Sequence, residues 1–470
     1  MARRKAAQKM GKQPPRKSAR AAKFPADRLP SELIHMIFAY LEPTEAAAFR
    51  WVGRVVAEIG LQYLTPTVYL ALKEESYDRL LAIAGHPVAS RYVVKLDYET
   101  NGLDFILRQD FDWKYRSMPV ISRHDSERPD SLASPRAWRV YQRESFRNMM
   151  LPSEKQTTQL LNRAWSTYEA YRTSHKNVQQ ANFFPEKIME ALKRFRNLKS
   201  ISADPDGAHK RYVAEIRELL PTLYVLGTRY STNFDPTTSI LLAAESAGLQ
   251  FETLACQPVS WQIFAQNTND LAALNRSILH LKIMDIAFSS SQDDFPNEDD
   301  TVQEVDFVGK FLDERRVRDL ITSATHLEYL GLAFKEVLRS NVHPTLKKTL
   351  GNFHWSSLKA VALESLASNE HDLVNFCKRH SRTLKDLSLK DMIQYEGLWH
   401  VTFHEVRRAF LLGQQLDTCE LRGIFSSPAY RIFMDHPEKR AGITISNYIR
   451  ATNIGDISLD EYYHELNQRL

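Results

Sequence analysis

The sequence predicts a mixed α/β protein in which a short helical hairpin precedes a long array of strand-and-helix repeats. Two observations carry this prediction. Residues 29–64 form a compact apolar segment with helical spacing, and a short apolar pattern recurs along the rest of the chain. The chain has 470 residues, 43% of them hydrophobic and 25% charged, which is ordinary for globular proteins. One compact core rarely serves a chain this long, so several domains or a repeat array are expected.

Positive charge is concentrated in the first 24 residues. Nine lysines and arginines lie between residues 3 and 23, whereas the first acidic residue is Asp27. With almost nothing apolar to bury, residues 1–24 are expected to be a disordered basic tail. The tail could be a nuclear localisation signal, a phosphate-contacting arm or a plain solvated terminus. The residues of the possible localisation signal are Arg3, Arg4, Lys5, Arg16, Lys17 and Arg20.

Net charge, cysteine positions and apolar stretches indicate where in the cell the protein is expected. The net charge of +5 is modest and does not by itself imply nucleic acid. Cys256, Cys377 and Cys419 are far apart, which predicts neither a disulfide framework nor a zinc site. A reducing compartment fits such a chain, so a cytoplasmic or nuclear location, or both, is expected. No apolar stretch approaches the ~18 residues of a membrane span, so no membrane association is expected.

Two helices joined at a proline turn are predicted between residues 29 and 64. Pro30 suits the first position of the first helix, where a missing N–H costs nothing. Thr44 is the expected N-cap of the second helix, whose apolar residues run from Ala46 to Ile59. Two helices this apolar cannot cover each other fully, so they need a third partner inside or outside the chain. The apolar face of the first helix consists of Leu33, Ile34, Ile37, Phe38 and Leu41.

This segment resembles an F-box. From residue 29 it reads Leu-Pro-x-Glu-Leu-x-x-x-Ile-Phe-x-Tyr-Leu, and Arg50-x-Val52-x-Arg54 follows the proline turn. The stretch from Val55 to Leu64 is similar to fungal members of that family. The chain departs from the family at Ala46 and Ala47, where leucines are frequent, and it lacks the Ser-Lys/Arg-x-Trp phrase after the valine.

The resemblance implies a helical domain, placed at residues 25–70, that docks on a Skp-family adaptor within a cullin-based ubiquitin ligase. The alternative is a packed hairpin that only caps the rest of the chain and binds no adaptor. The residues that the resemblance places against the adaptor are Leu29, Pro30, Leu33, Ile37, Phe38, Leu41, Val52 and Arg54.

A six-residue pattern recurs after the hairpin: an aliphatic residue, two others, an apolar residue, one other and an apolar residue. The last four copies lie 26 to 32 residues apart, at or just above the ~20–29 residues of leucine-rich repeats. Each copy is expected to be a short strand with alternate residues inward, followed by a helix that returns the chain. Copies begin at Val93, Ile278, Leu327, Leu358, Leu384 and Leu416, with a partial copy at Leu198.

We therefore expect an irregular leucine-rich-repeat-like solenoid over residues 71–470. Stacked repeats of this kind share a core and leave a long concave sheet for a partner. The alternative is an ordinary α/β domain with a few similar strands. Insertions are expected near residues 104–190, with a helix from Pro152 to Thr173, and at 289–306. The second insertion carries seven acidic residues and should be an exposed loop, without the alternating ligands of a calcium site.

Catalytic motifs are missing, so no catalytic residue, metal site or cofactor is predicted. His400 and His404 lie four residues apart before Glu405, but zinc hydrolysis of that type needs the glutamate between the histidines. Cys377 lies three residues before His380 without the oxyanion hole that a cysteine protease needs.

The resemblance implies the substrate-recognition subunit of a cullin-based, SCF-type E3 ubiquitin ligase. Such a subunit is not itself an enzyme: it docks on the adaptor and presents a target protein, whose identity the sequence does not reveal. Two alternatives stay open, a non-catalytic leucine-rich-repeat scaffold and a nuclear binding protein without a ligase role. Nucleic acid is expected to bind only weakly, through the basic tail.

Overall fold

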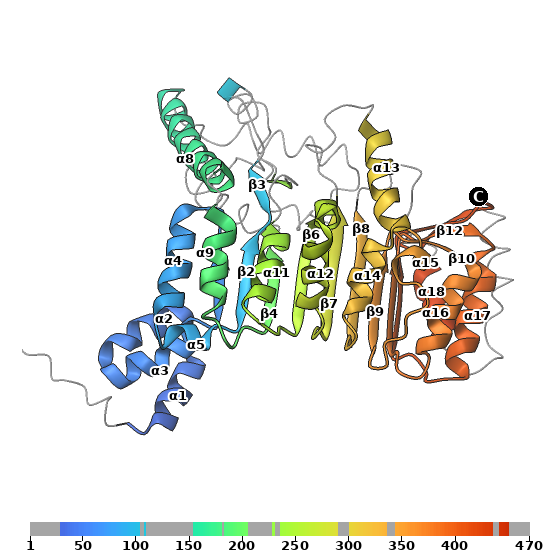
Figure 1. Ribbon diagram of the computed structural model, residues 1–470, viewed down its shortest axis with the longest axis horizontal. Coiled ribbons are helices and arrows are strands. Elements are labelled where there is room, and N and C mark those ends of the chain that lie inside the picture. Colours follow the sequence, from blue (N-terminus) through green and yellow to red (C-terminus); the bar gives the residue numbers. More distant parts are fainter. Residues whose placement is uncertain are drawn as a thin grey trace, which may run out of the picture. The chain divides into compact units, whose positions relative to one another are not determined.

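The computed structural model describes most of the chain between residues 29 and 450, in two compact units, Met1–Thr65 and Pro66–Leu470. We call residues 29–65 the helical unit and Pro66–Leu470 the body (Figure 1). Each has its own core. The described residues are 29–103, 108–109, 154–180, 183–204, 228–230, 236–289, 300–335, 344–435 and 441–450.

The helical unit contains three α-helices rather than the two predicted. They are α1 (Ser31–Tyr40), α2 (Pro43–Phe49) and α3 (Arg54–Leu64), with a 3₁₀ turn, η2 (Arg50–Val52), between the last two. The prediction of a single second helix was wrong. Extended backbone at Gly53 divides that stretch into two helices.

The caps of these helices also differ from the prediction. Pro30 is the N-cap of α1, one position before the helix, and its carbonyl accepts the first helical hydrogen bonds. Glu42, not Thr44, caps α2. The backbone N–H of Glu42 donates to the Glu45 side chain at 3.0 Å, and the two glutamates form a capping box. Pro43 then occupies the first helical position, where a proline is tolerated.

The core of the helical unit is built around Phe38. Its ring lies 5.2 Å from the ring of Phe49 and 5.3 Å from that of Tyr63, measured between centroids. Gly60 of α3 faces the same ring, and a Cβ at this position would lie 2.6 Å from Phe38 Cζ. The close approach of α3 to α1 therefore requires glycine at position 60.

The body is built on one large parallel sheet, which confirms the mixed α/β class. Nine described strands follow one another across the sheet in chain order, and every neighbouring pair is parallel. Residues 67–70, which the sequence pattern placed with the helical motif, form its first strand. The strands are β1 (Thr67–Leu70), β2 (Lys95–Glu99), β4 (Ser200–Asp204), β6 (Thr253–Ser260), β7 (Ile283–Ser289), β8 (Tyr329–Lys335), β9 (Ala360–Glu364), β11 (Asp386–Lys390) and β13 (Thr418–Arg422).

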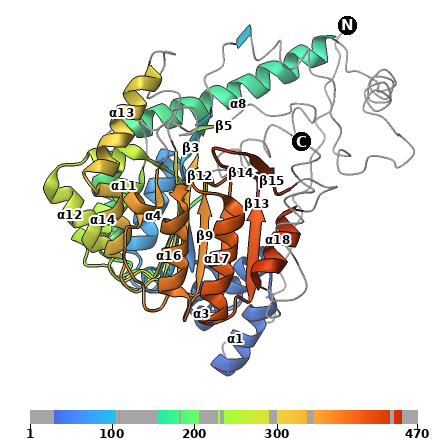
Figure 2. The ribbon, with the colours of Figure 1, turned by 90° about the vertical axis from the view of Figure 1, so that its right-hand side faces the viewer.

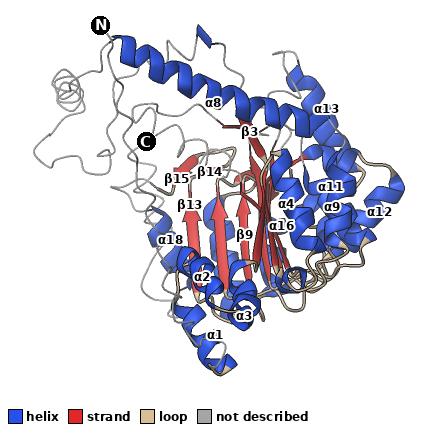
Figure 3. Cartoon of the chain, turned by 90° about the vertical axis from the view of Figure 1, so that its left-hand side faces the viewer, coloured by secondary structure: helices blue, strands red, loops and turns tan. Residues whose placement is uncertain are grey.

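Helices connect successive strands and pack on one another along one face of the sheet (Figures 1 and 3). Parallel strands need such crossovers, because a tight turn cannot join them. The connecting helices are α4 (Glu74–Gly85), α5 (Ala89–Tyr92), α9 (Phe183–Leu192), α11 (Pro236–Ser246), α12 (Thr268–Ser277), α14 (Arg316–Ser323), α15 (Leu346–Thr349), α16 (Glu370–His380) and α17 (Trp399–Leu411). A final helix, α18 (Ala441–Arg450), packs on β13, and a 3₁₀ turn, η5 (Trp261–Ala265), follows β6.

The two predicted insertions contain helices. The helix expected near residues 152–173 is confirmed as α8 (Glu154–Gln180), which is longer than predicted. The acidic loop is only partly correct, because β7 continues to Ser289 and residues 300–306 begin α13 (Asp300–Asp313). The rest of that loop lies outside the described residues. Two short strands, β3 (Asn101–Leu103) and β5 (Thr228–Tyr230), pair antiparallel beside the main sheet.

The recurring apolar pattern coincides with the strands of the sheet. Within the last four copies, the first apolar positions are buried just before each strand, and the second positions stand in register across neighbouring strands. The copy at Ile278 was misaligned by three residues. Its strand reads Leu281-x-x-Met284-x-Ile286, and Ile283, which the pattern placed inside, is 40% exposed.

A second, smaller sheet continues the last three strands. It consists of β10 (Ala367–Asn369), β12 (Ile393–Glu396), β14 (Ile424–Ser426) and β15 (Arg431–Phe433). The residue directly after β9, β11 and β13 turns the chain into this sheet, and all three have positive φ: Ser365 (58°), Asp391 (50°) and Gly423 (72°). The same left-handed turn therefore recurs in three successive strand connections.

Candidate functional site

An apolar stripe on α1 is left exposed by the described residues. Leu33, Met36 and Tyr40 are 45%, 57% and 86% exposed, and Ile37 is half-buried. Positions 33, 36, 37 and 40 follow helical spacing and share one face. Exposed apolar residues gathered on one face are typical of surfaces that bind a partner.

The unit's own core uses a different face of the same helix. Ile34 and Phe38, at positions i and i+4 of that second face, are fully buried against α2 and α3. Helix α1 is therefore apolar on two neighbouring faces, of which the core covers one.

A second exposed apolar group follows α2. Trp51 in η2 is 91% exposed, and Val52 and Val55 are also exposed. Large aromatic side chains contribute strongly to interfaces because they bury much area at low entropic cost. Together with the α1 stripe they form what we call the exposed apolar set: Leu33, Met36, Ile37, Tyr40, Trp51, Val52 and Val55.

The structure separates the eight residues that the F-box resemblance assigned to adaptor binding. Leu33, Ile37 and Val52 belong to the exposed apolar set. Pro30 and Arg54 are exposed as well, and Arg54 forms an ion pair with Glu58 at 3.3 Å.

The other three contact the unit's own core. Phe38 is 2% exposed, and Leu29 and Leu41 pack partly buried against the same cluster. Met36, Tyr40 and Trp51 were missed, although Met36 and Tyr40 lie three and seven residues after Leu33 and so share its face. Outside the described residues lie the six basic residues of the tail: Arg3, Arg4, Lys5, Arg16, Lys17 and Arg20.

The second candidate surface is the face of the sheet opposite the helices, which we call the open face. Side chains alternate between buried and half-buried along β9 and β11, so the half-buried ones face away from the helix layer. Five of the six residues in the middle row of this face are small, and all six stand in register on neighbouring strands. From β4 to β11 it reads Ser202, Ala255, then Asp285, Gly331, Ala362 and Ser388.

Charges on the open face are largely paired with one another. Lys390 binds Glu364 at 2.7 Å, and this hydrogen bond raises the pKa of the lysine. Lys95 binds Asp97 at 2.9 Å. Asp285 accepts a hydrogen bond from Gln257 at 2.8 Å. The face is thus polar and internally satisfied, with small side chains along its middle.

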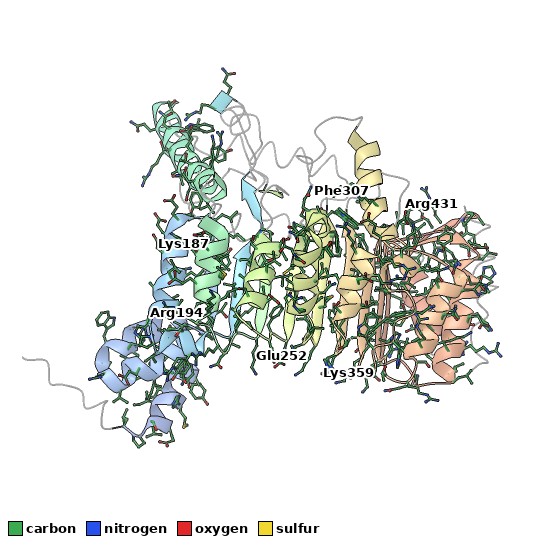
Figure 4. All side chains as sticks on the ribbon, viewed as in Figure 1. Lys187, Arg194, Glu252, Phe307, Lys359 and Arg431 are labelled. Atoms are coloured by element: carbon green, nitrogen blue, oxygen red, sulfur yellow. The ribbon has the colours of Figure 1, made fainter. Side chains whose placement is uncertain are left out.

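A row of alternating charges marks the edge where the strands begin, and Figure 4 labels two of its members, Glu252 and Lys359. Each residue of the row directly precedes a strand. Lys282 binds Glu252 at 2.8 Å, and their hydrogen bond lowers the pKa of Glu252. Lys359 binds Glu328 at 2.6 Å, which lowers the pKa of that glutamate in the same way. These pairs are exposed, so salt screens them.

The histidine and cysteine residues that were weighed as catalytic candidates are held in place by the fold. His380 is buried: its Nε2 accepts from the backbone N–H of Trp355 at 3.2 Å, and its Nδ1 donates to the carbonyl of Phe376 at 3.0 Å. Burial raises the pKa of the Cys377 thiol, which keeps it protonated at neutral pH.

His400 and His404 contact two different tyrosines, Tyr430 at 3.3 Å and Tyr448 at 2.8 Å. Nowhere in the described ranges do three or more histidine, cysteine or carboxylate side chains come together as a metal site would require. Likewise, none of the described helices has the length and apolarity that crossing a bilayer demands.

Comparison with known proteins does not assign the chain to a family. No protein-family model matches it, and none of the curated proteins matches it.

Proposed function

We propose that the chain is the substrate-recognition subunit of a cullin-based, SCF-type ubiquitin ligase, and that the helical unit docks on a Skp-family adaptor. The exposed apolar set of the helical unit is the observation that carries this proposal. Fully burying an apolar side chain such as Leu33 or Met36 would contribute about 1.5–3 kcal/mol, which the exposed unit does not gain. The exposed rings of Tyr40 and Trp51 add further area that a partner would cover. The F-box resemblance of the same residues names the partner.

The body would hold the target protein. We infer that it is an irregular leucine-rich-repeat-like solenoid whose open face contacts the target. Three features support this: strands that follow chain order, a recurring apolar pattern at their inner face, and the left-handed turn repeated at Ser365, Asp391 and Gly423. Alanine and serine at Ala255, Ala362 and Ser388 would let a partner approach these strands closely, whereas Asp285 and Tyr329 cover Gly331.

The protein would act by proximity rather than by chemistry of its own. A ubiquitin-conjugating enzyme carried by the ligase would meet a lysine of the bound target at high effective concentration. Neither Cys377 nor His380 takes part, because both are held in the core of the body.

Adaptor binding tests the proposal. The change is Leu33→Asp or Tyr40→Asp in the full chain, which places a carboxylate in the middle of the proposed interface. Affinity for a Skp-family adaptor, measured by titration calorimetry or pull-down, should fall about 30-fold or more, as for a residue worth ~2 kcal/mol.

Ala39→Asp is the matched control. It adds the same charge to the same helix at an exposed position off the stripe, so binding should stay close to that of the unchanged chain. Amide exchange in α1 and α3 shows whether each variant keeps the helical unit folded. A well-folded unchanged chain that does not bind the adaptor would overturn the proposal, and the body would then be described as a repeat scaffold.

A further inference from the structure

Two arginines from neighbouring helices of the body reach the same glycine turn. Gly351 lies two residues after α15 and has a φ of 59°. The side chain of Arg318 in α14 brings Nη1 within 3.5 Å of the point that a Cβ of residue 351 would occupy. Arg379 in α16 donates from Nη2 to the carbonyl of Gly351 at 3.0 Å. Figure 2 shows α14 and α16 in the helix layer, and α15 contacts both of them.

Neither arginine contacts a carboxylate within the described ranges, although both are half-buried. The guanidinium of Arg379 makes one further contact, from Nη1 to Asn352 Oδ1 at 3.5 Å, and its buried Nε has no acceptor there. Partial burial lowers the pKa of Arg379, and the nearby Cys377 and Asp372 act in the opposite direction. A positive charge taken out of water without a partner is unfavourable, and an anion bound at this turn would offset that cost.

Two lysines of the same helices are paired instead. Lys348 of α15 binds Asp313 at 2.6 Å, and Lys378 of α16 binds Glu405 at 3.4 Å. These pairs interrupt the positive surface, so the described helices carry no continuous basic stripe of the kind that follows a nucleic-acid backbone. The exposed Lys347, four residues before the glycine, adds one more positive charge to the same short segment.

We propose that Arg318 and Arg379 bind the phosphoryl group of a phosphate monoester at the Gly351 turn. A guanidinium donates two parallel hydrogen bonds to phosphate oxygens, and such charge-assisted bonds are stronger than neutral ones. A monoester carries a charge of about −1.5 to −2 at neutral pH, which matches two guanidinium groups better than a carboxylate does. Glycine leaves the turn without a side chain that would press on Arg318.

A phosphorylated side chain of a protein and free phosphate present this same chemistry, so the probes must separate them. The site belongs to the body alone. It therefore holds whether or not the helical unit binds an adaptor.

Titration calorimetry of the full chain tests the site. The probes are N-acetyl-phosphoserine methylamide, its unphosphorylated form and inorganic phosphate, and the unphosphorylated form should not bind. Arg318→Ala should weaken binding of the phosphorylated probe about tenfold or more, because one charged pair of hydrogen bonds is lost. Arg379→Lys keeps the positive charge but not the planar fork, so it should weaken binding as well.

The matched control is Arg408→Ala. It removes an exposed arginine of the next helix, α17, that is already paired with Glu405 at 3.6 Å. The net charge changes by the same amount as in Arg318→Ala, so binding should stay equal to that of the unchanged chain. Amide exchange in α14 and α16 shows that each variant keeps these helices folded.

The two sources of the phosphoryl group differ in their result. Tighter binding of the phosphoserine probe assigns the site to a phosphorylated protein, whereas equal or tighter binding of inorganic phosphate assigns it to the free ion. Three results would overturn the proposal. They are no binding of either probe by the folded unchanged chain, equal binding by Arg318→Ala and Arg379→Lys, and tighter binding of a single-stranded oligonucleotide that both variants lose.

Discussion

At the residue scale, buried polar groups show how the body keeps its interior neutral. His380 is enclosed by Trp355 and Phe376, and both of its ring nitrogens are used in the neutral form. A proton added to Nε2 would remove the hydrogen bond from Trp355 and bury a charge. Burial therefore lowers the pKa of His380 to about 4.

Lowering the pH should destabilise the body through this histidine. In the unfolded chain its pKa returns to about 6.5, so between pH 6.5 and 4 the unfolded state binds a proton that the native state does not. Stability is fully present above pH 6.5 and falls as the pH drops through this window, by up to about 3 kcal/mol. Urea unfolding of the unchanged chain and of His380→Gln at several pH values measures the difference. Equal pH slopes in the two proteins would contradict the assignment.

At the element scale, the helices of the small unit depend on one close crossing. Gly60 brings the backbone of α3 against Phe38 of α1, and the aliphatic part of Arg50 lies equally close to the point that a Cβ of residue 60 would occupy. The Arg50 side chain is itself fixed, because Nε donates to the carbonyl of Ala57 at 3.1 Å. No neighbour can move away cheaply, so this crossing tolerates little added volume.

Gly60→Ala should destabilise the helical unit. Overpacking costs ~1–3 kcal/mol, of which the better helix propensity of alanine returns up to ~1. We expect faster amide exchange throughout α1 and α3. Gly85→Ala is the control, because a Cβ at that helix end meets no atom within 4 Å. It should leave the exchange in α4 equal or slower. Unchanged protection of α1 in Gly60→Ala would show that the crossing can relax.

At the scale of the whole molecule, the chain consists of two units with separate cores. The small core gathers around Phe38, and the large one runs through all nine strands of the main sheet. The proposed adaptor surface belongs to the first unit, and the proposed target surface belongs to the second.

Two units with separate cores should unfold in two steps. Scanning calorimetry of the unchanged chain is expected to show two transitions, and Gly60→Ala should lower only the smaller one. A single transition that shifts as a whole in this variant would mean that the units unfold as one.

The sequence predicted the strands best where the pattern was regular. The copies at Leu327, Leu358, Leu384 and Leu416 lie close together, and each has buried residues at the required spacing. The copy at Ile278 was misaligned because both Ile278 and Leu281 are buried, so two registers satisfied the pattern equally.

Other features were not predicted from the sequence, because their residue types indicate a different structure or none in particular. The strand with Phe251-x-x-Leu254-x-Cys256 was overlooked, since an aromatic residue stands at the first position, which is aliphatic in every copy that was recognised. Exposure of Tyr40 and Trp51 could not be read from periodicity, which expects such residues inside. The positive φ at Ser365 has no signal in residue type, and that at Asp391 has only a weak one, because aspartate tolerates the left-handed region better than most residues.

The alternating charges at the edge where the strands begin have a further consequence for how the body assembles. From β4 to β9 the row reads Lys199, Glu252, Lys282, Glu328 and Lys359, one residue for each strand. A strand that docked one place too far along the sheet would bring two lysines or two glutamates together, and like charges in facing positions destabilise a strand pair. The native order matches every charge of this stretch with an opposite one, whereas at the next strand Lys385 directly follows Lys359. Between β4 and β9 the row therefore favours the native neighbours over a strand docked one place out of order.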